Sequence, residues 1–521
     1  MRSFVIIFSI LLVLFSLHQA QARIIHVPAD SSTIQAGING AVNGDTVLVA
    51  EGHYYKRISF NGKGILVASE FVNDSDTMHI INTVIDGDTT RTPLVSDTGS
   101  VVRFVNGEDS LSILEGFTIQ GGVGTLYSGT TRLGGGIYCK SSSPTVRNCV
   151  IKTNTATCGG GVFYLQSPGS PKLILCDIIG NTADSVGGGF GGQSNGIASF
   201  LGCRIMYNSA PQGGGIWCRS SYSTAILNCR VANNSDGLYC DWSGATIESS
   251  TFLNNKILGY HSGFTITGSK LDSSAVDGFS HSSLTDDTLF DSYVHAEDEH
   301  TARINKCRLL RSNITVHNAN AYVDSSIIAG KIRLYGEEMP WVRVTNSTLL
   351  GDSVIDQSFG GSRAKLWNCI LMTRGGPAIA GGPVTNRDSL TCCDVFGYQI
   401  SWIAGTPPLL DTANVLFLDP LFCDTANGDF GIYSHSPCAP DNNNCGVLIG
   451  AKDIGCICGD ANADGQVNSA DVSYLINYLF VNGPAPQPMQ AGDANCDGSV
   501  NSADVSYLIN YLFVSGPAPC C

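Results

Sequence analysis

The sequence predicts a mainly β fold: a long solenoid of stacked parallel coils, followed by a small α-helical module with two acidic loops. Three observations support this prediction. The 521-residue chain has 60 glycines and only 14% charged residues, a composition typical of strands and tight turns rather than of helical bundles. Its middle part repeats one pattern of residues at a nearly constant period. Near the C-terminus, one acidic loop occurs twice, at residues 460–471 and 493–504.

Residues 1–22 are predicted to be a secretion signal. Arg2 supplies positive charge, residues 4–17 form an apolar run, and Ala20-Gln21-Ala22 offers small side chains for cleavage. The apolar run is short for a membrane span, which favours cleavage over the alternative of a membrane anchor. We therefore expect a secreted protein, extracellular or held at the cell surface, whose cysteines meet an oxidising compartment. We expect no membrane span after signal removal.

The net charge of −15 disfavours nucleic acid as a partner. A phosphate backbone is bound by clustered Lys and Arg, and this chain has 29 basic residues against 44 acidic ones.

The repeat consists of columns of equivalent residues. One cysteine and one asparagine recur in each unit at almost equal spacing, and glycine triplets follow the first three asparagines. Repeats made only of short strands and turns suit a solenoid in which like positions lie above one another. The columns are Cys149, Cys176, Cys203 and Cys229, and Asn154, Asn181, Asn208 and Asn234.

Each unit contains alternating runs, such as residues 225–231, that we interpret as strands of about six residues. Shorter coils continue the repeat to about residue 370. In them the cysteine column becomes mostly serine, which predicts a column of small side chains facing inward. Its members are Ser250, Ser269, Cys307, Ser326, Ser347 and Cys369.

These units resemble the right-handed parallel β-helix of the pectin-lyase-like superfamily. The resemblance implies a β-helix domain over residues 23–450, in which residues 23–60 form an N-terminal capping segment. Within that segment, apolar residues at helical spacing over residues 34–42 predict a helix that covers the open end of the core. Residues 418–422 and 427–430 look like the closing segment of secreted members.

Enzymes of this superfamily are polysaccharide lyases and glycoside hydrolases, so the resemblance raises the question of catalysis. The densest charged stretch is residues 291–311, for which a solvated turn and an outward strand are the simpler interpretation. Asp286 and Asp287 are interpreted as turn residues that cap their own backbone. Nothing matches a catalytic signature, so the catalytic residues are unknown. The stretch contains His295, Glu297, Asp298, Glu299, His300, Arg303, Lys306, Arg308 and Arg311.

Two further columns have competing interpretations. Tyr138, Trp217, Tyr239 and Trp242 form either part of the core, which we favour, or an exposed stripe for sugar stacking. The cysteine column is predicted to hold unpaired buried thiols. Stacked side chains match disulfide geometry poorly, and the alternative of zinc lacks paired Cys-x-x-Cys motifs.

The two acidic loops have the ligand spacing of a calcium-binding loop, with oxygen side chains at positions 1, 3, 5, 9 and 12 and Gly at position 6. Residues at position 7 would contribute a backbone carbonyl. No Lys, Arg or Glu follows Lys452, so the crowded carboxylates call for a cation. The predicted ligands of two calcium ions are Asp460, Asn462, Asp464, Gln466, Asn468 and Asp471, and Asp493, Asn495, Asp497, Ser499, Asn501 and Asp504.

A predicted helix follows each loop and ends before Gly483-Pro484 or Gly516-Pro517, but no helix precedes either loop. Each helix places five apolar residues on one face. This arrangement resembles a dockerin domain, here residues 451–521. The resemblance implies a cohesin-type module on a scaffold or surface protein as the partner. It also implies partner contacts at loop positions 10 and 11, and their identity in both repeats predicts docking in two orientations. The five apolar positions are Val472, Leu475, Ile476, Leu479 and Phe480, and Val505, Leu508, Ile509, Leu512 and Phe513; the contact positions are Ser469, Ala470, Ser502 and Ala503.

Cysteines flank the module at both ends. The ends of a dockerin lie close together, so we predict at least one disulfide between Cys456 or Cys458 and Cys520 or Cys521; Cys496 has no predicted partner.

Together these features predict a secreted protein that docks through calcium-loaded loops and binds or degrades polysaccharide, by hydrolysis of O-glycosyl bonds or by lyase cleavage. The alternative is a non-catalytic surface or adhesive solenoid, which the absence of a recognisable catalytic set favours.

Overall fold

The computed structural model describes residues 22–519 except 89–98, 167–169, 194–197, 221–222, 279–280, 299, 338, 358–361, 382–387, 398–410 and 426–427. The predicted secretion signal lies outside this range apart from its last residue. The predicted mainly β solenoid is confirmed, with about 17 turns in the described chain. Two compact units make up the molecule, Met1–Gly237 and Leu238–Cys521. Among the described residues, no helix is long and apolar enough to cross a membrane.

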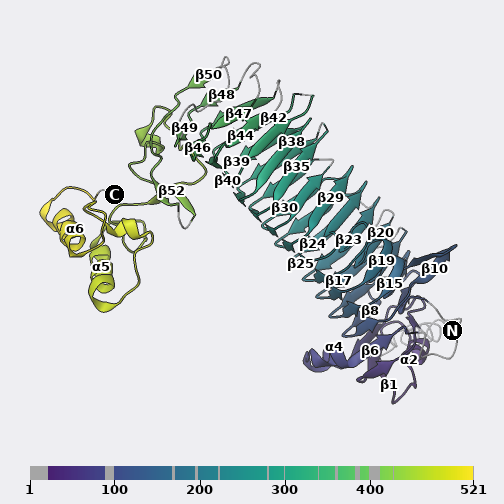
Figure 1. Ribbon diagram of the computed structural model, residues 1–521. Coiled ribbons are helices and arrows are strands. Elements are labelled where there is room, and N and C mark those ends of the chain that lie inside the picture. Colours follow the sequence, from purple (N-terminus) through teal and green to yellow (C-terminus); the bar gives the residue numbers. More distant parts are fainter. Residues whose placement is uncertain are drawn as a thin grey trace, which may run out of the picture. The chain divides into compact units, whose positions relative to one another are not determined.

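In the first unit, three parallel sheets run along the stacked coils (Figure 1). The first sheet contains β1 (Ile24–Val27), β2 (Thr46–Val49), β5 (Leu66–Ser69), β8 (Ile113–Glu115), β13 (Thr145–Arg147), β17 (Lys172–Ile174), β21 (Ser199–Leu201) and β24 (Thr224–Leu227). The second contains β3 (Gly52–Tyr54), β6 (Thr83–Asp86), β9 (Thr118–Gln120), β14 (Val150–Lys152), β18 (Asp177–Ile179), β22 (Arg204–Met206) and β25 (Arg230–Ala232). The third contains β4 (Ile58–Ser59), β7 (Val102–Phe104), β12 (Ile137–Lys140), β16 (Val162–Leu165), β20 (Phe190–Gln193) and β23 (Ile216–Arg219).

A small fourth sheet adds to the first unit beside these three. Its strands are β10 (Thr125–Ser128), β11 (Thr131–Leu133), β15 (Thr155–Cys158) and β19 (Thr182–Val186). The predicted N-terminal helix is present as α2 (Ile34–Gly40), with Ile34 and Ile38 buried. Two short helices, α3 (Phe71–Asp74) and α4 (Met78–Asn82), were not predicted.

The second unit continues with the same three kinds of strand. Those of the first sheet are β27 (Ala245–Glu248), β30 (Phe264–Thr267), β33 (Ser282–Thr285), β36 (Thr301–Asn305), β39 (Asn320–Asp324), β42 (Trp341–Thr345), β45 (Arg363–Trp367), β48 (Ser389–Thr391) and β50 (Asp411–Ala413). Those of the second are β28 (Thr251–Leu253), β31 (Lys270–Asp272), β34 (Thr288–Phe290), β37 (Arg308–Leu310), β40 (Ile327–Ala329), β43 (Thr348–Gly351), β46 (Ile370–Thr373) and β49 (Asp394–Phe396). Those of the third are β26 (Leu238–Asp241), β29 (Lys256–Tyr260), β32 (Ala275–Gly278), β35 (Tyr293–Glu297), β38 (Asn313–His317), β41 (Ile332–Tyr335), β44 (Ile355–Gln357) and β47 (Ile379–Gly381).

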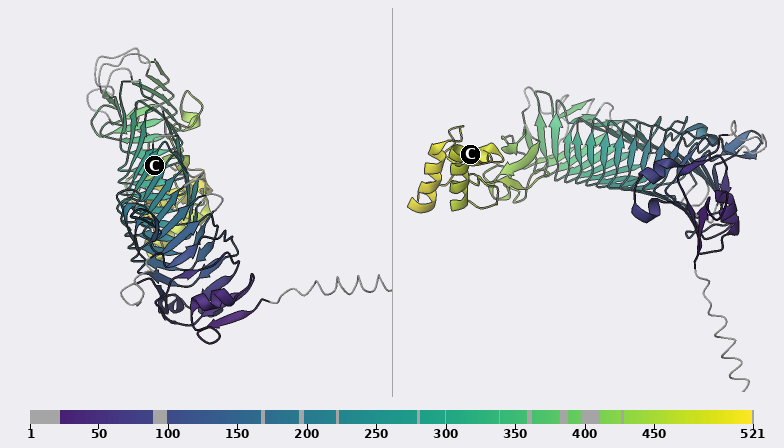
Figure 2. Two further views of the ribbon diagram at one scale, coloured as in Figure 1. Left: turned by 90° about the vertical axis from the view of Figure 1, so that its right-hand side faces the viewer. Right: turned by 90° about the horizontal axis from the view of Figure 1, so that it is seen from below.

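The second unit ends in a short sheet and the C-terminal module. The sheet pairs β51 (Phe422–Asp424) with β52 (Asp429–Tyr433) and β52 with β53 (Ile454–Cys456). Two 3-10 helices lie at Pro440–Asn442 and Met489–Gly492. The two α-helices of the module, α5 (Ser469–Val481) and α6 (Ser502–Val514), lie side by side (Figure 2).

The repeat columns occupy the positions that the sequence predicted. Cys149, Cys176, Cys203 and Cys229 are buried and remain thiols rather than half-cystines. The asparagines form a buried ladder. For example, Nδ2 of Asn181 donates to Oδ1 of Asn208 at 3.0 Å and to the carbonyl of Ile151 at 2.9 Å. Gly189 lies against this ladder, where an added Cβ would come within 2.6 Å of a neighbouring carbonyl.

The strands are shorter than predicted. The run 225–231 breaks into β24 and β25 because Asn228 adopts a left-handed conformation, with φ of 52°, just before the cysteine column. This corner turns the chain from the first sheet to the second, so each coil is a bent strand rather than a straight one.

Candidate functional site

The two acidic loops of the C-terminal module share one hydrogen-bonded geometry. Oδ2 of Asp460 accepts a hydrogen bond from the backbone N–H of Gly465 at 2.8 Å, and Asp493 accepts the same bond from Gly498 at 2.8 Å. Both glycines have φ of +86°, a conformation that favours glycine. The sharp turn at position 6 is therefore present in both loops.

The last residue of each loop links the loop to the helix that follows. Asp471 accepts hydrogen bonds from the backbone N–H groups of Asn462 at 3.2 Å and Asn468 at 2.8 Å. Asp504 makes the equivalent bonds in the second loop at 3.1 and 2.8 Å. Because Asn468 is the N-cap of α5, this carboxylate joins the start of the loop to the first turn of the helix.

The other predicted ligands lie in the same tight loops. The N–H groups of Gln466 and Ser499 each donate to the carboxylate two residues earlier at 3.0 Å. The Ser499 carbonyl, a predicted ligand, accepts a hydrogen bond from Nδ2 of Asn501 at 3.1 Å.

The donor set suits a hard cation. Asp471 is fully buried, which raises the pKa of its carboxyl group, and the carboxylates of Asp460 and Asp464 raise it further. The same causes act on Asp504. Every predicted donor is oxygen, and calcium takes six to eight oxygen ligands. A divalent cation at these loops would offset the repulsion between the carboxylates.

The helices after the loops bury only part of their apolar residues. Val472 and Leu475 pack with Val505 and Leu508 in the core of the module. Leu479 and Leu512 are partly buried against this core, whereas the remaining residues of the predicted apolar face are exposed. Ile476 and Ile509 are 40% exposed, and Phe480 and Phe513 are 66% and 68% exposed.

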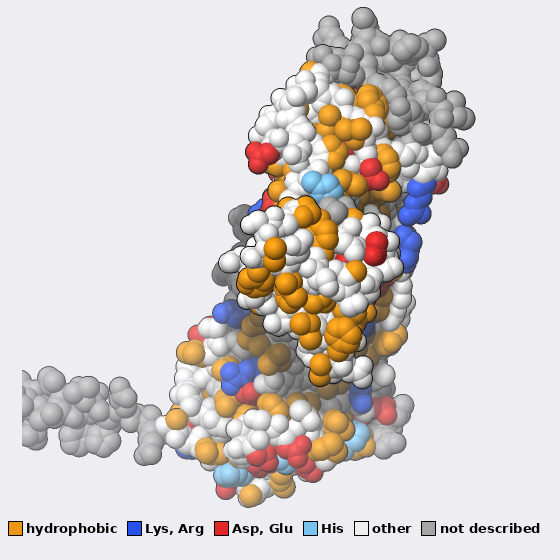
Figure 3. Space-filling view, turned by 90° about the vertical axis from the view of Figure 1, so that its left-hand side faces the viewer, with side chains coloured by type: hydrophobic (Ala, Val, Ile, Leu, Met, Phe, Trp, Pro, Cys, Tyr) orange, Lys and Arg blue, Asp and Glu red, His pale blue; other side chains and the backbone are white. Residues whose placement is uncertain are grey.

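Hydrophobic side chains gather on the surface of the molecule seen in Figure 3, and these four residues add exposed apolar area to the module. The predicted contact residues Ser469, Ala470, Ser502 and Ala503 are also exposed, at the N-termini of α5 and α6. The module therefore presents two equivalent mixed surfaces, one from each repeat.

Cys456, one of the two cysteines predicted to bond to Cys520 or Cys521, bonds instead to Cys423 with a Cα–Cα distance of 5.9 Å, and the predicted bond from Cys458 stays a prediction. The short sheet explains the difference, because β52 pairs with both β51 and β53 and so brings these two cysteines together. Cys458 and Cys496 are disulfide-bonded as well. Cys520 and Cys521 lie outside the described residues. A bond between Cys392 and Cys445 was not predicted.

A second candidate site lies on the outward face of the third sheet in the second unit. The strand register places Asp277 beside His295, and Glu297 beside His317. Nδ1 of His295 lies 3.2 Å from Oδ1 of Asp277, and Nδ1 of His317 lies 3.2 Å from Oε1 of Glu297. We call these four residues the histidine–carboxylate cluster.

Electrostatics favour positive charge in the cluster. The contact with Asp277 raises the pKa of His295, and the carboxylates of Glu297 and Asp298 raise it further. All four side chains of the cluster are between 18% and 29% exposed, so the group is half-buried but open to solvent.

Aromatic rings lie along the same face of the second unit. Tyr335 stacks on His317 with ring centroids 4.6 Å apart. At the other end of the face, Trp242 is 60% exposed and lies 4.1 Å from the ring of His261, which also contacts Tyr260. Exposed rings of this kind offer apolar faces to a sugar.

The aromatic column predicted from sequence therefore divides. Tyr138 and Trp217 are buried and Tyr239 is half-buried, whereas Trp242 is exposed, as the alternative of an exposed stripe expects.

The charged stretch 291–311 also divides, because the coil carries its residues onto different faces. Arg303 lies on the first sheet, away from the cluster, and its guanidinium carbon is 4.8 Å from the ring centroid of Tyr322. Arg311 forms two hydrogen bonds with Asp291, at 2.7 and 2.6 Å. These basic residues fit the solvated interpretation, whereas His295 and Glu297 join the cluster. Glu299 lies outside the described residues. The remaining members are Lys306 at a turn, Arg308 bonded to the Gly428 carbonyl, and His300 bonded to the Glu297 carbonyl.

Sequence reasoning missed Asp277 and His317 as partners in this site. Asp277 lies one coil before His295, and His317 lies one coil after Glu297. Counting one coil length back from His295 and one coil length forward from Glu297 along the sequence would have identified both partners.

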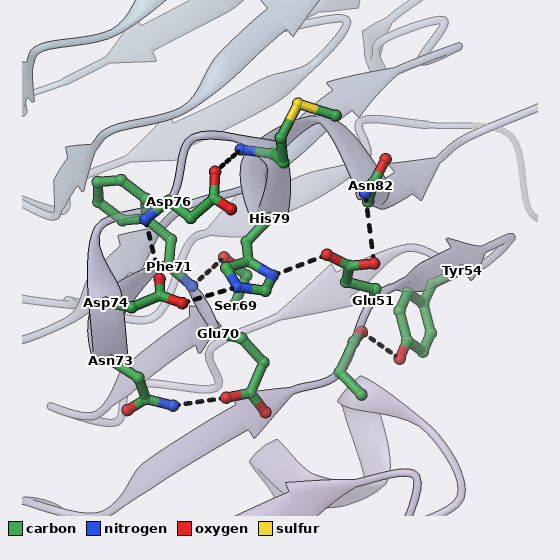
Figure 4. A network of polar contacts seen from close by, with 12 residues as sticks. Glu51, Tyr54, Ser69, Glu70, Phe71, Asn73, Asp74, Asp76, His79 and Asn82 are labelled. Atoms are coloured by element: carbon green, nitrogen blue, oxygen red, sulfur yellow. Dashed lines mark hydrogen bonds and ion pairs between the residues drawn. The ribbon is translucent and has the colours of Figure 1, made fainter.

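In the first unit, one histidine also contacts two carboxylates, but these carboxylates do not converge on one point as those of the cluster do. His79 contacts Glu51 through Nδ1 at 2.7 Å and Asp74 through Nε2 at 3.2 Å (Figure 4). Because the two ring nitrogens point in different directions, the carboxylates lie on opposite sides of the imidazole. This arrangement ties α4 to its neighbours rather than converging on a point.

Comparisons with known proteins agree with a chain that consists of a β-solenoid followed by a C-terminal module. A family model described as Dockerin type I domain matches residues 458–513, and one described as Right handed beta helix region matches residues 135–286. No curated protein matches the chain significantly. Dockerin type I domains bind calcium, dock to cohesin modules and are typical of extracellular cellulosome components.

Proposed function

We propose that this right-handed β-helix protein, which ends in a dockerin type I domain, is secreted and docks to a cohesin-bearing complex. We further propose that it binds polysaccharide along the outward face of β26 to β41. The single observation that carries the docking proposal is the duplication: two loops of one geometry, each followed by a helix with the same exposed residues.

Docking would use both repeats in alternation. Ser469 and Ala470 are matched by Ser502 and Ala503 in sequence, in exposure and in position at a helix N-terminus. A cohesin that recognises one pair, together with the exposed apolar residues behind it, meets the same surface after the module is turned around. Two orientations are therefore equivalent for the partner.

Calcium would fold the module rather than signal. We propose one ion in each loop, held by the oxygens of the predicted ligands, including Asp460 and Asp471 in the first loop and Asp493 and Asp504 in the second. No α-helix enters either loop in the described chain, so binding has no helix to swing open. Neutralising the buried carboxylates is what would stabilise the loops.

The test of docking uses the full chain and a panel of immobilised cohesins. We expect binding to one class of cohesin, weakened at least about 100-fold when calcium is chelated, with two calcium ions bound per chain by equilibrium dialysis. Ala470→Arg alone should retain binding, and Ala470→Arg with Ala503→Arg should lose it. Loss in the single variant would contradict the two orientations, and binding that ignores chelation would contradict the calcium dependence.

The polysaccharide proposal rests on the rings and the cluster sharing one face. Tyr260 follows Gly259, which lies in the same register column as Ala296, the residue before Glu297, two coils away, or about 10 Å at the strand spacing of a sheet. That distance corresponds to about two sugar residues. Polar hydrogen-bonding groups beside stacking rings form a surface of the kind that carbohydrates bind.

Cleavage of the bound polysaccharide is the second candidate function. It is favoured by Asp277 and Glu297, whose carboxylates approach one another within 4.8 Å and are flanked by histidines. Paired carboxylates at short range are the machinery of glycoside hydrolysis. Release of reducing ends or unsaturated products from a polysaccharide panel, abolished in Glu297→Gln, would establish an enzyme. Binding without product in both proteins would establish the adhesive alternative.

A further inference from the structure

The histidine–carboxylate cluster brings three different metal-binding groups to one point. One ligand atom from each of Asp277, His295 and Glu297 can be chosen so that all lie within 4.8 Å of one another. His295 and Glu297 are two residues apart on β35, so both point outward from the same strand. Asp277 approaches from the adjacent strand β32, in register with His295. The three donors are therefore fixed by the sheet and not by a loop.

Two atoms of the cluster lack the hydrogen bonds that buried polar atoms usually have. Oδ1 of Asp277 and Nε2 of His295 are both buried and without a hydrogen-bond partner among the described residues. Oδ1 does approach Nδ1 of His295 at 3.2 Å, but without the directional geometry of a hydrogen bond. A cation here would take the place of the proton that the carboxylates favour on His295, because a deprotonated imidazole nitrogen and a carboxylate oxygen are both metal-ligand atoms.

We propose that Asp277, His295 and Glu297 bind one divalent first-row transition-metal cation of the zinc type, and that His317 positions Glu297 for this role. The choice of metal follows from the donors. A mixed set of one imidazole and two carboxylates suits zinc and its neighbours, whereas calcium takes six to eight oxygens. This site thus differs in kind from the all-oxygen loops of the C-terminal module.

The geometry needs only small adjustments to receive the ion. Zinc holds its nitrogen and oxygen ligands at about 2.1 Å, which in a tetrahedral site separates ligand atoms by about 3.4 Å. The donors, now up to 4.8 Å apart, would close by about 1 Å through side-chain rotation. Three protein ligands leave a fourth position open to water or to a sugar oxygen.

His317 completes the arrangement from the other side. It contacts Glu297 at 3.2 Å, and its ring is held in place by the stack on Tyr335. A group that hydrogen-bonds a metal-binding carboxylate fixes its orientation, and removing such a group typically weakens metal binding 10- to 100-fold.

The test measures zinc binding to the full, untagged chain in excess calcium, which saturates the loops of the C-terminal module. We expect one zinc ion per chain by equilibrium dialysis with elemental analysis. His295→Ala and Glu297→Gln should each abolish it, and His317→Gln should weaken it 10- to 100-fold. Circular dichroism identifies any variant that fails to fold. If one of the two ligand variants does not fold, zinc binding by the other one tests the proposal.

The matched control is His79→Ala, which removes a histidine that touches two carboxylates on opposite sides of its ring. This variant should bind zinc like the unmodified protein. Cobalt substitution gives an independent reading, because nitrogen and oxygen ligands produce visible bands without a thiolate charge-transfer band. Zinc binding that survives in both His295→Ala and Glu297→Gln, a cobalt spectrum with thiolate character, or no zinc bound at all would overturn the proposal.

Discussion

The repeating coils of the first unit and those of the second solve the same folding problem with different side chains. Over residues 145–225 of the first unit, each coil is 26 or 27 residues long and carries an inward cysteine, a buried asparagine and a glycine triplet. In the second unit, coils are shorter and vary in length. Buried serines take over the ladder there, as where the N–H of Ser274 donates to Oγ of Ser292 at 3.1 Å.

The extra residues of the longer coils have a visible consequence. In the first unit they supply the small fourth sheet, and the outward aromatic residues Phe163 and Trp217 are buried around a cavity of about 170 Å³ that Tyr127 and Val186 of that sheet also line. The shorter coils of the second unit have no such cover among the described residues. Their third sheet keeps an open face, and the cluster and the exposed rings lie on that face. Coil length therefore decides which part of the solenoid can meet a ligand.

The largest effect is expected from breaking the asparagine ladder. The side chain of Asn208 accepts two hydrogen bonds from Asn181 and donates one each to Asn234 and the Ile178 carbonyl. In Asn208→Ala, buried donors and acceptors on the two neighbouring coils lose their partners, so we expect a loss of about 5 kcal/mol in local stability. Hydrogen exchange of the amides in residues 150–235 measures it.

Ser292→Ala is the matched change in the serine ladder. Ser292 accepts one hydrogen bond from Ser274 and donates to the Phe290 carbonyl at 2.7 Å, so its loss should cost only about 1 to 2 kcal/mol. If the two variants lost equal protection against amide hydrogen exchange, the asparagine ladder would not be the more stabilising of the two ladders.

The next effect concerns Asp287, which stands in the second unit's other buried column, that of the inward cysteines and serines, next to Ser269. Burial raises the pKa of Asp287 to about 7, although its carboxyl group accepts hydrogen bonds from Ser269 and Thr285. A raised pKa means that the folded state holds the proton more tightly than the unfolded state does. The stability from this group is complete below about pH 4 and is lost as the pH rises through 7.

Asp287→Ser restores the ordinary column residue and removes this dependence. At pH 8 the variant should be the more stable protein, by an amount that falls as the pH is lowered toward 4. The shift of about three pKa units sets an upper bound on the order of 4 kcal/mol. Unfolding in urea at several pH values measures the difference, and parallel curves for the two proteins would contradict the assignment.

The sequence predicted the buried columns where the repeat has a constant number of residues, and missed column members where that number varies. The cysteine and asparagine columns of the first unit were found because their spacing hardly varies. Asp287 does accept a hydrogen bond from the nearby N–H of Thr285, as the turn interpretation expects, but variable coil lengths concealed its place in the buried column.

The same variation hid the pairing of Asp277 with His295 and of Glu297 with His317, which depends on strand register. The bond between Cys423 and Cys456 depends on a short sheet that no repeat predicts. Helical periodicity placed Phe480 with the core residues but could not say where the packed face ends, because the exposed side of the helix is apolar too.

The smallest effect is expected from the exposed rings on the open face. Trp242→Ala should weaken polysaccharide binding about 5- to 10-fold, since one stacked ring contributes about 1 kcal/mol, and it should leave the fold intact because Trp242 is 60% exposed. Affinity electrophoresis on the polysaccharide that the full chain retains measures the change. The control is Tyr207→Ala, which removes an equally exposed ring, 61%, from the first unit. If both variants lost affinity equally, the open face would not be the binding surface, and coil length would not be what separates the two units in function.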